Sequence, residues 1–121
     1  NHTLMAILLE CSFPNSTPDD MLFGHLTPRH FMEELRVLAD AVNTTHKETV
    51  LRDVQVIVTH IKPNLYGTAR KIIENELNEL NMLNIDLIIP NQGDLYTIPH
   101  EAIKEKHNPL YWPYILVVCI G

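Results

Sequence analysis

The stretch that most constrains the fold runs from residue 54 to residue 63 and reads V-Q-V-I-V-T-H-I-K-P. Its β-branched residues describe a strand that is buried over most of its surface. Open α/β sheets build their sites at the carboxyl edge of such strands. Thr59 and His60 are the first polar side chains at that edge. Groups that work with His60 are therefore expected at this same edge.

The composition is that of one ordinary globular domain. The chain has 121 residues, of which 45% are hydrophobic and 20% are charged, and this length suffices to bury a core. The formal net charge of −6 argues against nucleic acid as a partner, because a phosphate backbone requires a basic surface. Cys11 and Cys119 form neither a disulfide framework nor a C-x-x-C pair, so a reducing compartment is expected.

The ends of the sequence carry no targeting signal. The N-terminus lacks the features of a signal peptide, and the apolar run at 114–120 is far shorter than the roughly 20 residues that cross a bilayer. We therefore expect a cytoplasmic protein without a membrane partner. The chain runs from Asn1 almost at once into L-M-A-I-L-L, so we expect that it begins inside a domain.

The first half of the chain predicts a strand, a loop and a helix. Residues 4–9 are continuously apolar, which is typical of a strand covered on both faces. Residues 14–20 have the composition of a loop. A helix is predicted over 27–43, with Thr27 as its cap and Pro28 in its first turn. Its apolar stripe is expected to comprise Phe31, Leu35, Leu38 and Val42.

The second half repeats this order. After the strand that ends at His60, a helix capped by Thr68 is predicted through about residue 83, followed by a buried strand at 85–89 and an edge strand at 95–98. Residues 101–106 are consistent with a helical turn or two, and 114–120 with a strand or a packed tail. The order strand, helix, strand, helix, strand predicts an α/β fold with βαβ units and a mainly parallel sheet.

Polar residues follow the first two predicted strands where each ends. Glu10 and Ser12 end the first strand, His25 precedes the first helix, and His60 ends the second strand. Adjacent parallel strands place their carboxyl ends on one edge, so these residues are expected to share a cleft.

Each candidate also has an ordinary interpretation. His60 is either a metal ligand or a histidine hydrogen-bonded at a sheet edge, and the residues alone favour the second, because zinc sites need three or four ligands and no H-x-H or H-E-x-x-H occurs. His25 is either a general acid beside Glu10 or a loop histidine. Lys62 is either a phosphate-binding charge or a solvated lysine, and the second is favoured.

Three motifs in order resemble a known family. They are L-L-E-C-S-F-P, G-H-L-T-P opening a helix, and V-I-V-T-H-I-K-P. Together they are similar to the C-terminal part of class II cyclic nucleotide phosphodiesterases, which include the low-affinity cAMP phosphodiesterase of yeasts. The resemblance covers residues 1 to about 98.

The resemblance implies a metallo-β-lactamase fold, a four-layered αββα sandwich with a dinuclear zinc site. It implies hydrolysis of cAMP and cGMP to 5′-monophosphates, with the cyclic nucleotide as substrate. Paired zinc ions of this kind activate a hydroxide and bind phosphoryl oxygens. Carried onto this sequence, His60 is a zinc ligand, His25 is the donor to the scissile phosphate and Glu10 is the acidic partner of His25. Ser12 and Lys62 are the expected substrate-binding residues, although the motifs leave their roles open.

The chain lacks the H-x-H-x-D-H signature of the family. The other zinc ligands and the upstream part of the domain are therefore expected outside it, and the chain alone is expected to be inactive. Residues 1–98 are assigned to the phosphodiesterase domain and 99–121 to an extension or tail. Two alternatives stay open: a metal-free α/β domain that binds a small ligand or a protein, and another phosphodiesterase of this fold, such as an RNA-processing enzyme. A homodimer, and the preference for cAMP or cGMP, also stay open.

Overall fold

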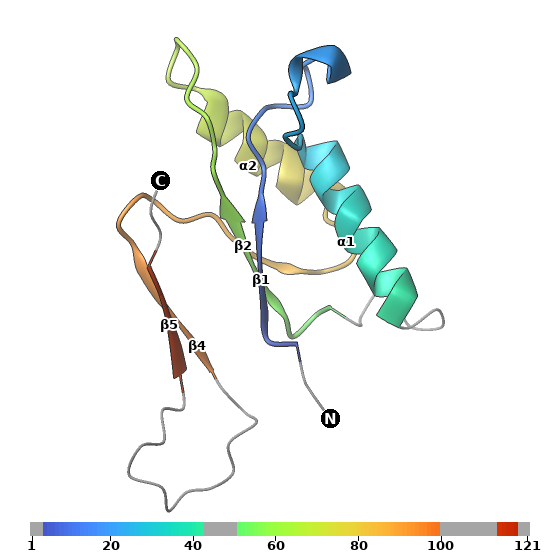
Figure 1. The fold of residues 1–121 in the computed structure, drawn as a ribbon, viewed down its shortest axis with the longest axis vertical. Coiled ribbons are helices and arrows are strands. Elements are labelled where there is room, and N and C mark those ends of the chain that lie inside the picture. The colour runs from blue at the N-terminus through green and yellow to red at the C-terminus, as the bar shows by residue number, and fades with distance from the viewer. Residues whose placement is uncertain (1–3, 43–50, 100–113, 119–121) are drawn as a thin grey trace, which may run out of the picture.

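The chain forms a parallel sheet of three strands, with two helices on one face, and a separate pair of antiparallel strands (Figure 1). This computed structural model describes residues 4–42, 51–99 and 114–118. The fold is α/β, as predicted. The elements are β1 (Ala6–Glu10), the 3₁₀ turn η1 (Asp19–Met21), α1 (Pro28–Val42), β2 (Gln55–Thr59), α2 (Ala69–Leu80), β3 (Asp86–Ile88), β4 (Leu95–Pro99) and β5 (Tyr114–Val118).

The sheet has the order β1-β2-β3, and both of its pairings are parallel. Helix α1 connects β1 to β2, and α2 connects β2 to β3, so the predicted βαβ arrangement is present. The register pairs Glu10 of β1 with Thr59 of β2. The carboxyl ends of these two strands therefore lie side by side, which is the condition for a common site at this edge.

The core lies between the sheet and the two helices (Figure 1). Alternate residues of β2, Val56 and Val58, point toward the helices and are buried. The helices contribute fully buried side chains that include Phe31 from α1 and Ile73 and Leu77 from α2. Burying such a side chain contributes about 1.5–3 kcal/mol, so this core holds β1 and β2 in fixed register beneath the site.

The opposite face of the sheet, here called the outer face, includes Ala6, Leu8, Gln55, Ile57, Asp86 and Ile88, with Glu10 and Thr59 at the carboxyl edge. Leu8 is 55% exposed although β1 was predicted to be covered on both faces. That prediction is wrong for the described residues, because none of them covers the outer side of Leu8. On the same face the Oε1 atom of Gln55 is buried without a hydrogen-bond partner among the described residues.

Helix α1 begins where the sequence predicted. The Thr27 carbonyl accepts the first helical hydrogen bond, from the Phe31 N–H at 2.8 Å, and the Thr27 hydroxyl accepts a weak one from the His30 N–H at 3.5 Å. Val42 was predicted to be in the buried stripe but is 58% exposed, while Ala39 is fully buried. The difference arises because Val42 is the last residue of the helix and no described residue covers its side chain, whereas Ala39 still packs in the core.

Helix α2 is bounded by two asparagines. Thr68 was predicted to cap the helix, but its side chain makes no capping bond. Asn64 instead accepts from the Thr68 N–H and donates to the Thr68 hydroxyl, both at 2.9 Å. The helix ends at Leu80 rather than near 83, because the Asn81 side chain bonds the carbonyl and the N–H of Ile85, at 2.8 and 3.1 Å, and forms a turn there.

The predicted edge strand at 95–98 is β4, which pairs with β5 and aligns Leu95 with Val118. The predicted boundary between the phosphodiesterase domain and the C-terminal extension, between residues 98 and 99, falls inside β4. This domain boundary stays a prediction. The helical turns predicted at 101–106 lie outside the described residues.

Within the described ranges, none of the helices has the length and hydrophobicity needed to cross a membrane.

Candidate functional site

The backbones that follow β1 and β2 stay paired beyond the strand ends. The Cys11 N–H donates to the Thr59 carbonyl at 3.0 Å, and the Lys62 N–H donates to the Ser12 carbonyl at 3.1 Å. His60 lies between these bonded positions with a φ of 60°. A left-handed backbone at a residue other than glycine costs about 1–2 kcal/mol. The two flanking hydrogen bonds hold His60 in this conformation and turn it out of the ladder.

The loop before α1 is fixed against the same edge. The Ser12 N–H donates to the Leu26 carbonyl at 2.9 Å, and Glu10 Oε1 accepts from the Leu26 N–H at 2.6 Å. The His25 N–H donates to the Leu22 carbonyl at 2.9 Å. These bonds place His25 beside the residues that end β1.

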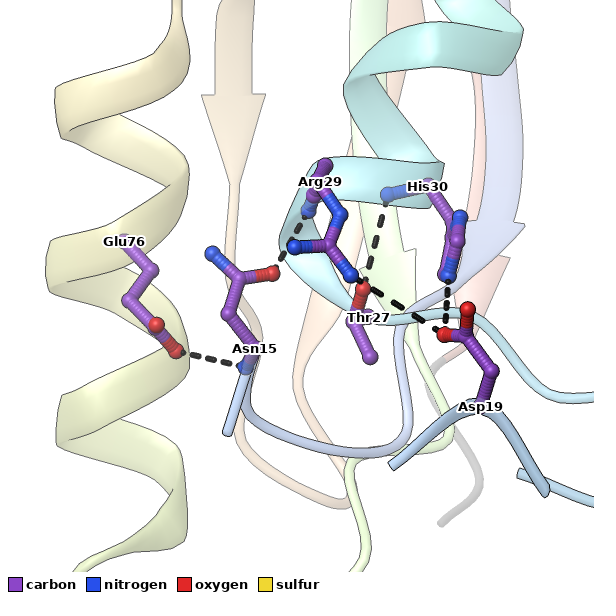
Figure 2. A network of polar contacts seen from close by, with 6 residues as sticks. All are labelled: Asn15, Asp19, Thr27, Arg29, His30 and Glu76. Carbon is purple, nitrogen blue, oxygen red and sulfur yellow. Dashed lines mark hydrogen bonds and ion pairs between the residues drawn. The ribbon is translucent and has the colours of Figure 1, made fainter. Parts of the chain in front are cut away.

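A polar network anchors the first part of this loop to both helices (Figure 2). The Asn15 N–H donates to Glu76 Oε1 at 3.0 Å, and Asn15 Oδ1 accepts from the Arg29 N–H at 2.8 Å. Asp19 Oδ1 lies 3.1 Å from His30 Nε2 and 3.9 Å from Arg29 Nη2. The loop that leads to His25 is thus fixed at Asn15 and at Asp19. Its composition predicted a loop but not these contacts.

Glu10, Ser12 and His25 form a hydrogen-bonded group. The Ser12 hydroxyl donates to Glu10 Oε2 at 2.6 Å and lies 3.3 Å from His25 Nδ1. The direct separation between His25 Nδ1 and Glu10 Oε2 is 3.7 Å. Ser12 is fully buried, whereas His25 and Glu10 are partly exposed. The serine therefore lies beneath the histidine, and the histidine faces solvent.

Aromatic contacts complete the group. The His25 and His60 rings stack with centroids 5.3 Å apart and an interplanar angle of 26°. Phe13 meets the His25 ring edge-on, with centroids 5.9 Å apart, and Lys62 Nζ lies 5.4 Å from the Phe13 ring centroid. Phe13 thus positions both a predicted donor and a predicted phosphate contact. Phe13 was not among the predicted site residues, although it directly follows the E-C-S motif.

All of the predicted site residues lie at one edge of the sheet. Glu10, Ser12 and His25 contact one another, His60 stacks on His25, and Lys62 joins through Phe13. The catalytic, substrate-binding and metal-binding roles assigned to them stay predictions. For Ser12, complete burial and the bond to Glu10 favour a role beneath the site over direct contact with a substrate.

Cys11 lies next to this group but belongs to the core. Its side chain is fully buried. Burial, and to a smaller extent the nearby carboxylates of Glu10 and Glu76, raise the pKa of the Cys11 thiol to about 12. The thiol is therefore neutral and unreactive in the folded chain, and it is unsuited to be a nucleophile or a metal ligand.

The described residues do not form a metal site by themselves. No cluster of three or more His, Cys, Asp or Glu side chains among them could hold a metal ion. His60 is exposed, and no described residue hydrogen-bonds its ring nitrogens. An imidazole that is free at the end of a strand fits the role of a single ligand.

Known proteins resemble this chain over the segment that carries the site. Phosphodiesterase A of Dictyostelium discoideum, named for cAMP and cGMP, is 41% identical over 97 residues, which are 75% of this chain and 22% of that protein. The 3′,5′-cyclic-nucleotide phosphodiesterase of Aliivibrio fischeri is 42% identical over 93 residues, 75% of this chain and 27% of that protein. The chain therefore spans about a quarter of the length of these relatives.

A solved structure is also similar. The crystal structure of unliganded yeast PDE1 matches with a TM-score of 0.57 and 34% identity, over 69% of this chain and 23% of that one. This match supports the metallo-β-lactamase-like fold predicted from the motifs. The amoebal and bacterial relatives show that the resemblance extends beyond fungi. The sequence model of one family, described as "cAMP phosphodiesterases class-II", matches residues 1–93. The chain belongs to the class-II cAMP phosphodiesterase family.

Proposed function

We propose that this chain supplies one side of the active site of a 3′,5′-cyclic-nucleotide phosphodiesterase. The observation that carries the proposal is the convergence of Glu10, His25 and His60 at one sheet edge, in a chain whose relatives bear that name. Hydrolysis of the cyclic ester forms a bond between phosphorus and a water oxygen and breaks the bond from phosphorus to the 3′-oxygen. The departing oxygen then requires a proton.

His25 is the proposed donor of that proton. Its ring is partly exposed and is held between Ser12 and Phe13. The Glu10 carboxylate close behind it stabilises the positively charged imidazolium that donates. A positioned general acid typically contributes ~10²–10⁴ in rate. Lys62, whose Nζ lies 5.4 Å from the Phe13 ring centroid, is the proposed contact for a phosphate oxygen.

Zinc is the proposed cofactor, with His60 as one ligand. Bound zinc lowers the pKa of a water molecule and offsets the charge that develops on the phosphate. The sequence lacks the H-x-H-x-D-H signature, and the described residues hold no set of three ligands. The other ligands are therefore proposed to come from the upstream part of the domain.

The upstream part of the same domain is the proposed partner of this chain. The outer face of the sheet presents the exposed Leu8. A second sheet packed there would cover this side chain and could supply a hydrogen-bond partner for the buried Gln55 Oε1 atom, which has none among the described residues. Val37 on α1 is a matched control, because it is also 55% exposed but lies on a helix. We expect Leu8→Asp to lower the stability of a polypeptide that includes the upstream part more than Val37→Asp does. Equal effects would contradict this placement.

The function is tested by assaying conversion of cAMP and cGMP to 5′-monophosphates in the active polypeptide that contains this chain. We expect His25→Gln to reduce kcat by ~10²-fold or more, and His60→Ala to reduce both bound zinc and turnover. His30→Gln is the control, because that imidazole contacts Asp19 rather than the site. Full zinc content and normal turnover in His60→Ala would refute the assignment. Turnover of RNA, but of neither cyclic nucleotide, would assign the site to an RNA-processing phosphodiesterase instead.

A further inference from the structure

Ser12 connects the segments that carry the proposed site residues. Its N–H donates to the Leu26 carbonyl of the loop before α1, and its carbonyl accepts from the Lys62 N–H after β2. Its hydroxyl lies between the side chains of Glu10 and His25. The side chain is 0% exposed, and within the described part of the chain its hydroxyl has these two side-chain partners. A buried hydroxyl without a partner would cost about 1–3 kcal/mol.

The direction of each hydrogen bond follows from the number of available hydrogens. Glu10 accepts from the Leu26 N–H on Oε1 and from Ser12 on Oε2, as an ionised carboxylate does. The Ser12 hydroxyl has one hydrogen, and the 2.6 Å contact commits it to Glu10. Toward His25 the same oxygen can only accept, so the 3.3 Å contact requires a hydrogen on Nδ1 of the imidazole.

We propose that Ser12 is a positioning residue that relays the Glu10 carboxylate to His25, keeps a hydrogen on Nδ1 and leaves Nε2 to face the reacting phosphate ester. The carboxylate does not replace the hydroxyl in this arrangement, because Glu10 Oε2 is 3.7 Å from Nδ1 and beyond hydrogen-bond distance. No described residue hydrogen-bonds Nε2. That nitrogen donates when the ring is protonated and accepts when it is neutral.

The consequence for catalysis rests on the proposed function, but the tautomer is measurable without it. In long-range ¹H–¹⁵N spectra of the full chain, recorded at alkaline pH on neutral imidazoles, we expect His25 to carry its hydrogen on Nδ1. Ser12→Ala should remove this preference and produce a mixture with hydrogen on Nε2. Ser16→Ala is the matched control, because this exposed serine lies in the same loop and its loss should leave the His25 spectrum unchanged.

Kinetics supply the second measurement. In an active polypeptide that contains this chain, we expect Ser12→Ala to lower kcat by roughly tenfold or more, as part of the ~10²–10⁴ contributed by a positioned acid, with little change in KM. An increase in KM alone would overturn the proposal and assign Ser12 to substrate binding. If Ser12→Ala fails to fold, the wild-type spectrum still decides, because a neutral His25 with its hydrogen on Nε2 overturns the relay. Absence of phosphodiesterase activity would refute the proposed function, whereas the spectra would still test the relay.

Discussion

The backbone of His60 gives the sharpest test of how this site is built. Its φ of 60° lies in the left-handed region, where a residue with a Cβ is destabilised by about 1–2 kcal/mol. Glycine avoids this strain but loses about 0.5–1 kcal/mol more than other residues in conformational entropy on folding. We therefore expect His60→Gly to be more stable than His60→Ala by about 0.5–1 kcal/mol, the difference between these two terms.

The comparison is between the two variants, not with the wild type. Both lack the imidazole and its stacking on His25, so the lost side-chain contacts cancel and the backbone term remains. For a chain of this size, with an m-value of about 1–2 kcal/mol/M, the urea midpoint of His60→Gly should be higher by roughly 0.3–1 M. Urea titrations followed by circular dichroism measure this shift directly.

Lys71 supplies the control with the opposite sign. It is exposed and lies within α2, where glycine destabilises a helix relative to alanine by about 0.8–1 kcal/mol. Lys71→Gly should therefore be less stable than Lys71→Ala. If His60→Gly were also the less stable variant of its pair, His60 would not have a left-handed backbone, and the geometry that turns it out of the ladder would be wrong.

Three further predictions concern the scaffold beneath the site. The Cys11 thiol should react with a thiol reagent only when the chain unfolds. Because folding raises its pKa from 9.0 to about 12, the stability that the neutral thiol contributes should be complete below about pH 9 and should fall between about pH 9 and 12. Urea titrations across that pH range measure this fall. Asn64→Ala should destabilise the chain by about 0.5–2 kcal/mol, because it removes both bonds to Thr68 at the start of α2; Asn75→Ala, in the exposed part of the same helix, should not destabilise it. Leu77→Ala should cost about 2–5 kcal/mol in the same assay, because Leu77 is fully buried, and a cost below 1 kcal/mol would contradict the position of α2 over the sheet.

The fold was largely predictable because its signals are local. The β-branched run at 54–58 and the helical spacing of Phe31 and Leu35 are properties of short segments, and the strand and helix they predict are present. Two errors are local, because the side chains of Asn64 and Asn81 set the ends of α2. The others concern positions where a distant partner decides. Leu8 was predicted to be covered on both faces, yet exposure of its outer side depends on what packs there and not on the apolar run that contains it.

The candidate site also has a part that was predictable from the sequence and a part that was not. Topology brought Glu10, His25 and His60 to one edge, because the ends of adjacent parallel strands must meet there. The contacts within that edge were not predictable, because they depend on ångström-scale placement of loops. Phe13 beside His25, and the hydroxyl of Ser12 between His25 and Glu10, are contacts of this kind.

The two histidines are held by different means, and this difference bears on their separate roles. His25 is fixed through its side chain, by the buried Ser12 hydroxyl and the edge of Phe13, which is suited to a group that must present one particular nitrogen. His60 is fixed through its backbone, by the hydrogen bonds on either side of a left-handed residue, which leaves both of its ring nitrogens free of described hydrogen bonds. A metal ligand requires a free nitrogen, and a proton donor requires a defined tautomer. The way in which each ring is held therefore supports His60 as the ligand and His25 as the acid.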